Sequence, residues 1–96
     1  MKLVSVTKSD KSGKKLKAIF KDPKSGRTKK VYFGAAGMDD YTKTHDSAQR
    51  NRYLKRHSKD LRGDPTRAGY LSYYILWGKS TSLSSNISAY KRKFHL

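Results

Sequence analysis

The chain contains no cysteine, no glutamate and only two prolines among its 96 residues. The lack of cysteine excludes a disulfide framework and a thiolate zinc site. There is no run of about 18 apolar residues, which a membrane-spanning helix needs. The start, MKLVSVTKSDKSGKK, has too short an apolar run for a signal peptide. These absences together predict a soluble intracellular protein without a transmembrane segment.

Acidic residues are scarce, with seven aspartates against 23 lysines and arginines, which gives a formal net charge of +16. Such an excess predicts attraction to a polyanion, with nucleic acid the commonest partner and an anionic membrane surface the second. A chain of 96 residues forms one domain with one modest core. That length leaves little room for a cleft with converging titratable groups, so we expect a protein that is not an enzyme.

Residues 1–33 have the alternation and turn residues of a basic three-stranded antiparallel β-meander. Two segments that end in glycine, residues 9–13 and 22–26, fit the turns between the strands. In the first strand Val4 and Val6 alternate with polar residues. The face expected to point inward carries Leu16, Ala18, Phe20, Val31 and Phe33. The opposite face is basic with one aromatic residue, and carries Lys15, Lys17, Ile19, Lys21, Thr28, Lys30 and Tyr32.

Residues 34–43 show no periodicity and are expected to form a loop, and residues 44–96 read as three helices. The first helix is predicted to begin at Asp46, an N-cap with Gln49 at the capping-box spacing. One stripe of this helix should dock on the core and contains Arg50, Leu54, His57 and Leu61. The opposite side is uniformly cationic and contains Arg52, Lys55, Arg56 and Lys59.

The second helix is predicted to follow Asp64 and Pro65 and to end at Gly78 in a left-handed conformation. Its centre is apolar on nearly all sides, with Leu71, Tyr74, Ile75 and Trp77 as expected core residues. The third spans Ser82 to Phe94 and places Leu83, Ile87, Tyr90 and Phe94 on one stripe. The sequence therefore predicts an α+β fold in which the N-terminal meander packs on three C-terminal helices.

The segment from Asp39 to Asp60 combines aspartates and histidines that would suit a metal or acid/base site. His45 and His57 are twelve residues apart, however, which is wrong for the helical zinc motif that needs two histidines four apart. Asp46 has a structural role as a cap, and Asp60 can pair with nearby bases. We therefore predict no cofactor and no catalytic or metal-binding residue here, although hard-metal binding by Asp39 and Asp40 stays open.

The cationic faces are the stronger functional signal because charged helix faces normally mix signs. They predict contact with a phosphate backbone, above all that of double-stranded DNA, with affinity from counterion release. The chain has no recognition-helix pattern, zinc finger or paired aromatic motif, so binding without sequence preference is expected. The residues predicted to contact nucleic acid are Lys15, Lys17, Lys21, Lys30, Tyr32, Arg50, Arg52, Lys55, Arg56 and Lys59.

Three groups of residues within about residues 31–94 form a recognisable pattern: Tyr41, Thr42, His45 and Asp46; Arg52, Tyr53, Arg56 and His57; and Asp64, Pro65, Ala68, Gly69, Leu76 and Trp77. This pattern resembles a family of small basic proteins of unknown function from large nucleocytoplasmic DNA viruses, including chlorella-virus and mimivirus relatives, and from some algae. The chain departs from the family pattern at residues 61–62 and 78–80. The resemblance implies a viral setting and no particular activity.

Two non-enzymatic functions remain open in that setting. The first is a DNA-binding protein that neutralises viral DNA, inside the infected host cell or packaged in the virion. The second is a minor capsid or other structural virion protein that bridges larger capsid components. The second would show exposed apolar patches, whereas the first would hold its basic residues on one surface.

Overall fold

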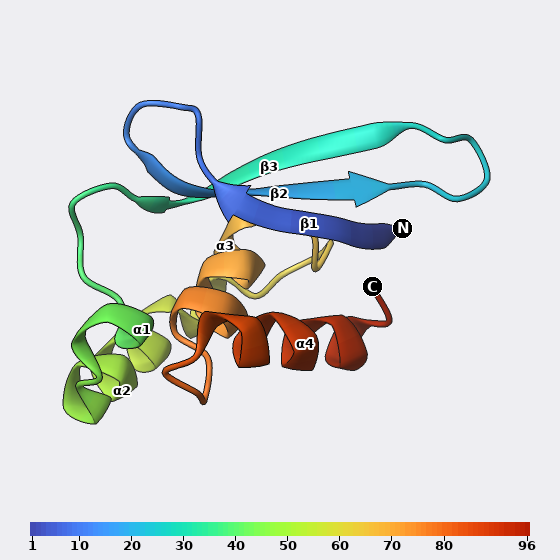
Figure 1. Ribbon diagram of the computed structural model, residues 1–96. Coiled ribbons are helices and arrows are strands. Elements are labelled where there is room, and N and C mark those ends of the chain that lie inside the picture. Colours follow the sequence, from blue (N-terminus) through green and yellow to red (C-terminus); the bar gives the residue numbers. More distant parts are fainter.

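The computed structural model describes residues 1–96 and begins with a three-stranded antiparallel sheet (Figure 1). The strands are β1 (Lys2–Lys8), β2 (Lys14–Lys21) and β3 (Thr28–Ala35), in the order β1-β2-β3. The predicted meander is thereby confirmed. Gly13 and Gly26 have φ of 85° and 73°, so the two turns use the left-handed conformation that glycine adopts without strain.

A β-bulge in β1 changes which residues of that strand face the core. Leu3 pairs with Phe20, and the next paired residue is Ser5 opposite Ile19, so Val4 is an extra residue in the ladder. Val4 is consequently 58% exposed, while Leu3 is buried and Val6 packs against the core. Simple alternation predicted that Val4 and Val6 lie on the same face of the sheet, but because of the bulge only Val6 packs against the core.

The helical part contains four α-helices, where the sequence pattern indicated three. They are α1 (Tyr41–Thr44), α2 (Ser47–His57), α3 (Ala68–Leu71) and α4 (Leu83–Phe94). A 3₁₀ turn, Ser58–Asp60, extends α2, and a π-helical segment, Ser72–Leu76, extends α3. The single turn of α1 begins within residues 34–43, which were expected to be a loop, because four residues carry no helical period. The predicted cap of α2 is confirmed, because the side chain of Asp46 accepts a hydrogen bond from the Gln49 amide at 3.1 Å.

The helix expected to begin at Pro65 begins at Ala68 instead. The Asp64 carboxylate accepts hydrogen bonds from the backbone amide and the hydroxyl of Thr66, at 2.9 and 2.8 Å, and so forms a local turn. These hydrogen bonds from Thr66 lower the pKa of Asp64 below its usual value. The ammonium group of Lys29 donates to the Thr66 hydroxyl at 2.8 Å and connects this turn to β3.

Gly78 does not end the preceding helix in a left-handed conformation, as the sequence suggested. Its role is close packing, since a Cβ atom there would lie 2.4 Å from the Tyr74 carbonyl oxygen and 2.5 Å from Cγ of Asn86. The buried Asn86 amide donates to the carbonyls of Ile75 and Ser80, at 2.8 and 2.7 Å, and its oxygen accepts from the Ser80 amide at 3.0 Å. Asn86 therefore fixes the turn between the π-helical segment and α4.

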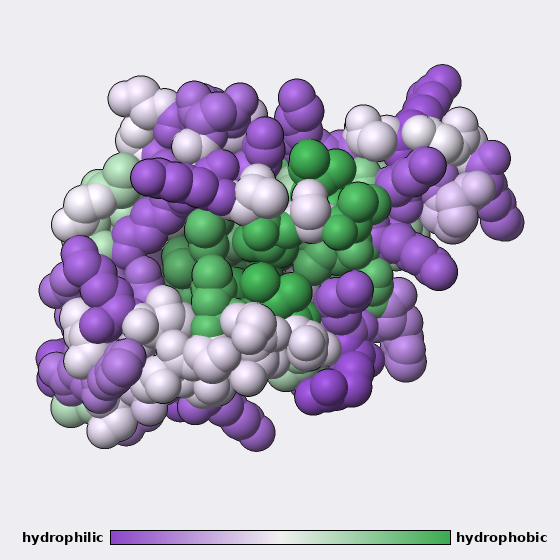
Figure 2. All heavy atoms as spheres, viewed as in Figure 1, coloured by the Kyte–Doolittle hydropathy of each residue, from purple (hydrophilic) through white to green (hydrophobic).

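The core lies between the inner face of the sheet and the helices, as predicted. Figure 2 shows apolar side chains gathered between the sheet and α4, with hydrophilic side chains around them. The Tyr90 hydroxyl donates to the Pro65 carbonyl at 2.7 Å, and burial raises the pKa of this tyrosine. Nine buried residues form the core: Leu3, Ala18, Phe20, Phe33, Leu71, Ile75, Leu76, Trp77 and Tyr90. None of the helices is both long and apolar enough to span a membrane.

Candidate nucleic-acid interface

Every aspartate of the chain has a local partner. Four form ion pairs with Lys15, Lys17, Lys29 and Lys43, and the fifth, Asp60, lies 2.8 Å from Nδ1 of His57. The other two accept backbone hydrogen bonds, Asp22 in a turn and Asp46 at the cap of α2. Only four of the 23 lysines and arginines make an ion pair, which leaves 19 without a carboxylate partner. The positive charge is therefore not cancelled locally.

The outer face of the sheet carries four of the predicted contact residues. Lys21 and Lys30 are exposed, whereas Lys17 lies 3.7 Å from Asp10 and the Tyr32 hydroxyl donates to Asp10 at 3.0 Å. That hydrogen bond lowers the pKa of Asp10 and raises the pKa of Tyr32. A carboxylate therefore sits within this face and occupies two of the groups expected to contact phosphate.

Lys15 is placed differently from the other sheet lysines. Its ammonium group lies 2.6 Å from a carboxylate oxygen of Asp40, and the whole Asp40 residue is only 4% exposed. Thr42 also donates a hydrogen bond to Asp40. Lys15 therefore neutralises a buried charge at the end of the sheet and is not available on the outer face.

Arg50 is also engaged within the protein. Its Nε donates to the carbonyl oxygens of Trp77 and Gly78, at 3.0 and 2.9 Å, and its guanidinium lies 5.5 Å from the ring centroid of Tyr41. These contacts join α2 to the end of the π-helical segment. The position of Arg50 agrees with the predicted docking stripe of α2 and assigns this arginine a structural role.

The remaining predicted residues lie on α2 and its 3₁₀ turn, and all four are exposed without an ion pair. Two further arginines that sequence reasoning missed extend this row, since Lys59, Arg62 and Arg67 line one shallow hollow. Their position on both sides of the Gly63-Asp64-Pro65 turn was the available signal. We call Arg52, Lys55, Arg56, Lys59, Arg62 and Arg67 the α2 surface.

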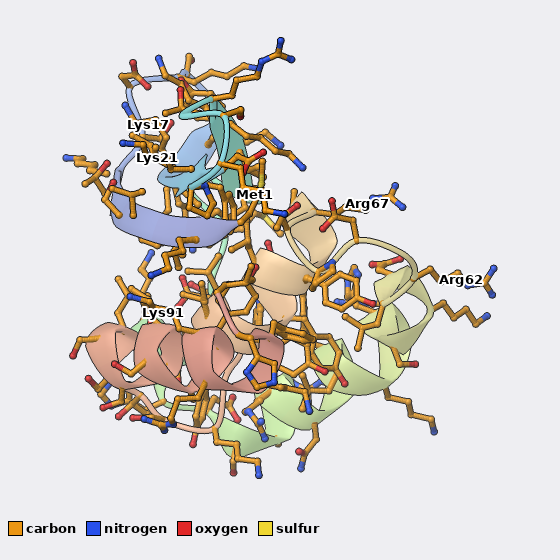
Figure 3. The ribbon with its side chains drawn as sticks, turned by 90° about the vertical axis from the view of Figure 1, so that its right-hand side faces the viewer. Met1, Lys17, Lys21, Arg62, Arg67 and Lys91 are labelled. Carbon is orange, nitrogen blue, oxygen red and sulfur yellow. The ribbon has the colours of Figure 1, made fainter.

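The α2 surface and the outer sheet face do not form one continuous patch. All helices lie beneath the inner face of the sheet (Figure 1). Figure 3 shows Lys17 and Lys21 on the sheet, and Arg62 and Arg67 projecting from the other side of the molecule. The sequence could not separate the two faces, because their separation depends on how the helices pack.

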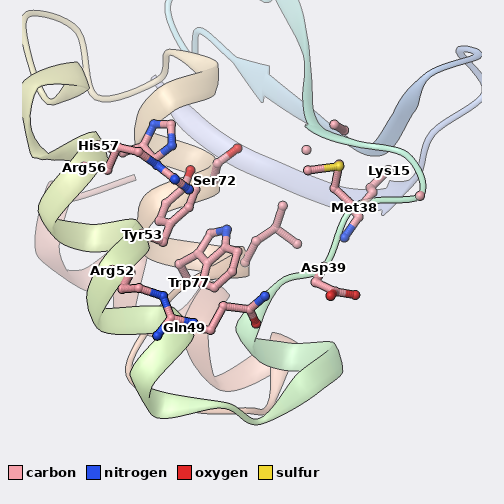
Figure 4. Close-up of a pocket in the computed structure, with 14 residues that line it drawn as sticks. Lys15, Met38, Asp39, Gln49, Arg52, Tyr53, Arg56, His57, Ser72 and Trp77 are labelled. Atoms are coloured by element: carbon pink, nitrogen blue, oxygen red, sulfur yellow. The ribbon is translucent and has the colours of Figure 1, made fainter.

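A groove of about 600 Å³ separates α2 from the loop that follows β3 (Figure 4). Arg52 and Arg56 line it, so they do not point away from the body of the protein as a helical wheel indicated. The side chains of His57, Tyr53 and Trp77 form a column of stacked rings along one wall, with centroid separations of 4.2 and 4.3 Å. Burial raises the pKa of Tyr53. Gly34, Ala35, Gly37, Met38 and Asp39 form most of the opposite wall.

The aspartates and histidines between Asp39 and Asp60 have separate local partners and do not form one site. His45 ends α1 with φ of 56°, and Nδ1 of His57 lies 2.8 Å from Asp60. Asp39 pairs with Lys43 at 3.9 Å. The structure brings no three histidine or carboxylate side chains together in a way that could hold a metal ion.

Residues 4–57 match the model of a protein family that is described as a family of unknown function (DUF5754). The chain is also 42% identical over 81 residues to the "Uncharacterized protein L851" of Acanthamoeba polyphaga mimivirus, a match that covers 77% of this chain and 80% of that protein. No solved structure matches the chain. Part of the residues that carried the resemblance meet in the groove, since Arg52, Tyr53, Arg56, His57, Leu76 and Trp77 line it, whereas Tyr41 to Asp46 and Asp64 to Gly69 do not.

Proposed function

The chain belongs to the family of unknown function DUF5754 and has a relative in a large DNA virus, and from that premise we propose that it is a non-enzymatic nucleic-acid-binding protein. Its ligand is double-stranded DNA, bound through the phosphate backbone without sequence preference. The α2 surface forms the main contact, and the outer sheet face is a second and separate basic face.

One observation carries this proposal, namely the row of six cations on the α2 surface without a carboxylate partner. The carboxylate beside this row is that of Asp60, and it contacts His57. Six unpaired charges side by side repel one another and attract counterions, and a polyanion that displaces those counterions gains entropy. A surface that served solubility alone would mix signs.

The absence of sequence preference follows from the form of this surface. Its lysines and arginines are exposed around a helix and a turn, where they can reach phosphates across a backbone. Phosphate contacts position a protein on DNA but carry no sequence information. The viral relative adds a setting, the infected host cell, in which the protein neutralises viral DNA either during replication or in the virion.

The proposal predicts a steep salt dependence for binding to a random-sequence duplex. If each of the six residues releases one counterion, the slope of log affinity against log salt is about −5. The measurement is a titration of labelled duplex by fluorescence anisotropy at several salt concentrations, with duplexes of unrelated sequence. No binding at ~50 mM salt, or binding that salt does not change, would overturn the proposal and favour a structural virion protein. Affinities that differ more than about tenfold between sequences would overturn the absence of sequence preference.

A further inference from the structure

The groove beside α2 contains a hydrogen-bond donor that makes no hydrogen bond within the protein and remains accessible to solvent. Trp77 is 7% exposed, and its indole N–H makes no hydrogen bond although the indole nitrogen still has access to solvent. Figure 4 shows this nitrogen on the side of the ring that faces the cavity. An indole N–H can only donate, so this solvent-accessible donor is available to an acceptor of a ligand in the groove.

Two arginines line the same groove. Arg52 and Arg56 are one helical turn apart on α2, both line the groove, and neither has a carboxylate partner. The acidic residue of the lining is Asp39, which pairs with Lys43. Two arginines and an N–H donor together suit a phosphate group, because guanidinium groups bind phosphate oxygens in a bidentate manner.

The rest of the lining suits a flat and apolar body attached to that phosphate. Tyr53 and Trp77 contribute two nearly parallel rings, inclined by 8° to each other, and Leu76 also lines the groove. Met38 on the opposite wall is 63% exposed, and its thioether favours contact with aromatic rings. The volume of about 600 Å³ falls within the range of small-molecule sites.

We propose that this groove binds a single nucleotide unit, with its phosphate on Arg52, Arg56 and the Trp77 N–H and its base between the ring column and Met38. The choice of a nucleotide as the ligand rests on the proposed function. The inference adds a site for an unpaired nucleotide to a surface that is proposed to bind the duplex backbone. The unit is either a free nucleotide or part of a single strand, since both present the same phosphate and base.

Trp77 is the one tryptophan of the chain, so its fluorescence reports on the groove directly. We expect deoxyadenosine monophosphate to change this fluorescence saturably. Deoxyadenosine and inorganic phosphate, which each supply half of the ligand, should bind at least about tenfold more weakly. Equal binding of inorganic phosphate would overturn the nucleotide assignment, because the groove would then be a simple anion site.

Variants separate the groove from the rest of the α2 surface. Arg52→Gln and Arg56→Gln should each weaken the nucleotide about tenfold, because each removes a charge-assisted hydrogen bond. Lys55→Gln removes the same charge from the same helix but does not line the groove, so it should leave nucleotide affinity unchanged within twofold. Unchanged nucleotide affinity in both arginine variants would refute the site.

A single-stranded hexanucleotide identifies the source of the ligand. If it competes with the mononucleotide for the Trp77 signal, the groove holds a unit of an unpaired strand. If the mononucleotide alone changes the signal, the ligand is a free nucleotide. Duplex binding without any nucleotide signal would refute the groove and leave the proposed function intact, whereas a nucleotide signal without duplex binding would refute the proposed function and leave the groove.

Discussion

Replacement of Lys55, Lys59, Arg62 and Arg67 by glutamine is expected to make duplex binding less sensitive to salt. The slope of log affinity against log salt should become less negative by about 3.6, which is about 0.9 for each phosphate that the variant no longer neutralises. Between ~50 and ~200 mM salt the wild type should lose about a thousandfold in affinity and the variant only about tenfold. The four positions lie outside the groove, so the change tests backbone binding and leaves the nucleotide site intact. Anisotropy titrations with one duplex at four salt concentrations measure both slopes.

The chain offers a charge-matched control on the other side of the molecule. Lys2, Lys21, Lys24 and Lys30 are also exposed and belong to the sheet and its second turn. Their replacement by glutamine removes the same net charge but should change the slope by less than about half as much. Equal effects of the two quadruple variants would show that net charge, and not the α2 surface, determines binding. Thermal unfolding should be almost unchanged in both, because exposed unpaired charges contribute little to stability.

Replacement of Asn86 by alanine is expected to lower the free energy of unfolding by about 3 kcal/mol, the largest effect that we expect from one polar side chain here. Asn86 is only 2% exposed. Its side chain hydrogen-bonds to the carbonyls of Ile75 and Ser80 and to the amide of Ser80. Alanine would leave these groups without their partner and would open a cavity beside Gly78. Urea unfolding monitored by circular dichroism measures the change.

Two further substitutions test whether the lost hydrogen bonds of Asn86 cause that loss of stability. Asn86→Asp keeps the acceptor for Ser80 but places an oxygen opposite two carbonyl oxygens, so it should be at least as destabilising as alanine. Asn51→Ala changes the other asparagine of the chain, an exposed residue of α2, and should alter stability by less than about 0.5 kcal/mol. A mild effect of Asn86→Ala, similar to that of Asn51→Ala, would contradict the role assigned to this side chain.

The sheet and α2 could be predicted from the sequence because their signals are local. Glycine-ended turns separate alternating strands, and Asp46 marks the beginning of α2. Non-local contacts account for what could not be predicted. Asn86 hydrogen-bonds to the Ile75 carbonyl eleven residues away, which helps to explain why the predicted continuous helix is π-helical at its end. The bulge at Val4 likewise depends on pairing with β2.

Residue types in the candidate site were easier to predict than their positions. The sequence pattern identified Lys55 and Lys59 as exposed cations, and the structure agrees. It also selected Lys15 and Arg50, whose partners, a carboxylate 25 residues away and two backbone carbonyls, become visible only in the folded chain. The groove could not be foreseen at all, because it joins residues 34–39 to α2 and Trp77.

The backbone amide of Leu3 donates to the carbonyl of Leu96 at 2.8 Å, and Figure 1 shows the two chain ends close together. Measured along the sequence, this bond closes the longest loop in the molecule, whereas β1, β2 and β3 pair through short turns. Closing a long loop costs more chain entropy than closing a hairpin, so the meander should form before its edge strand is joined to the end of the chain. Pulse-labelling hydrogen exchange during refolding should therefore show the Leu3 amide protected later than the amides of β2. Simultaneous protection would mean that sheet and helices assemble in a single step.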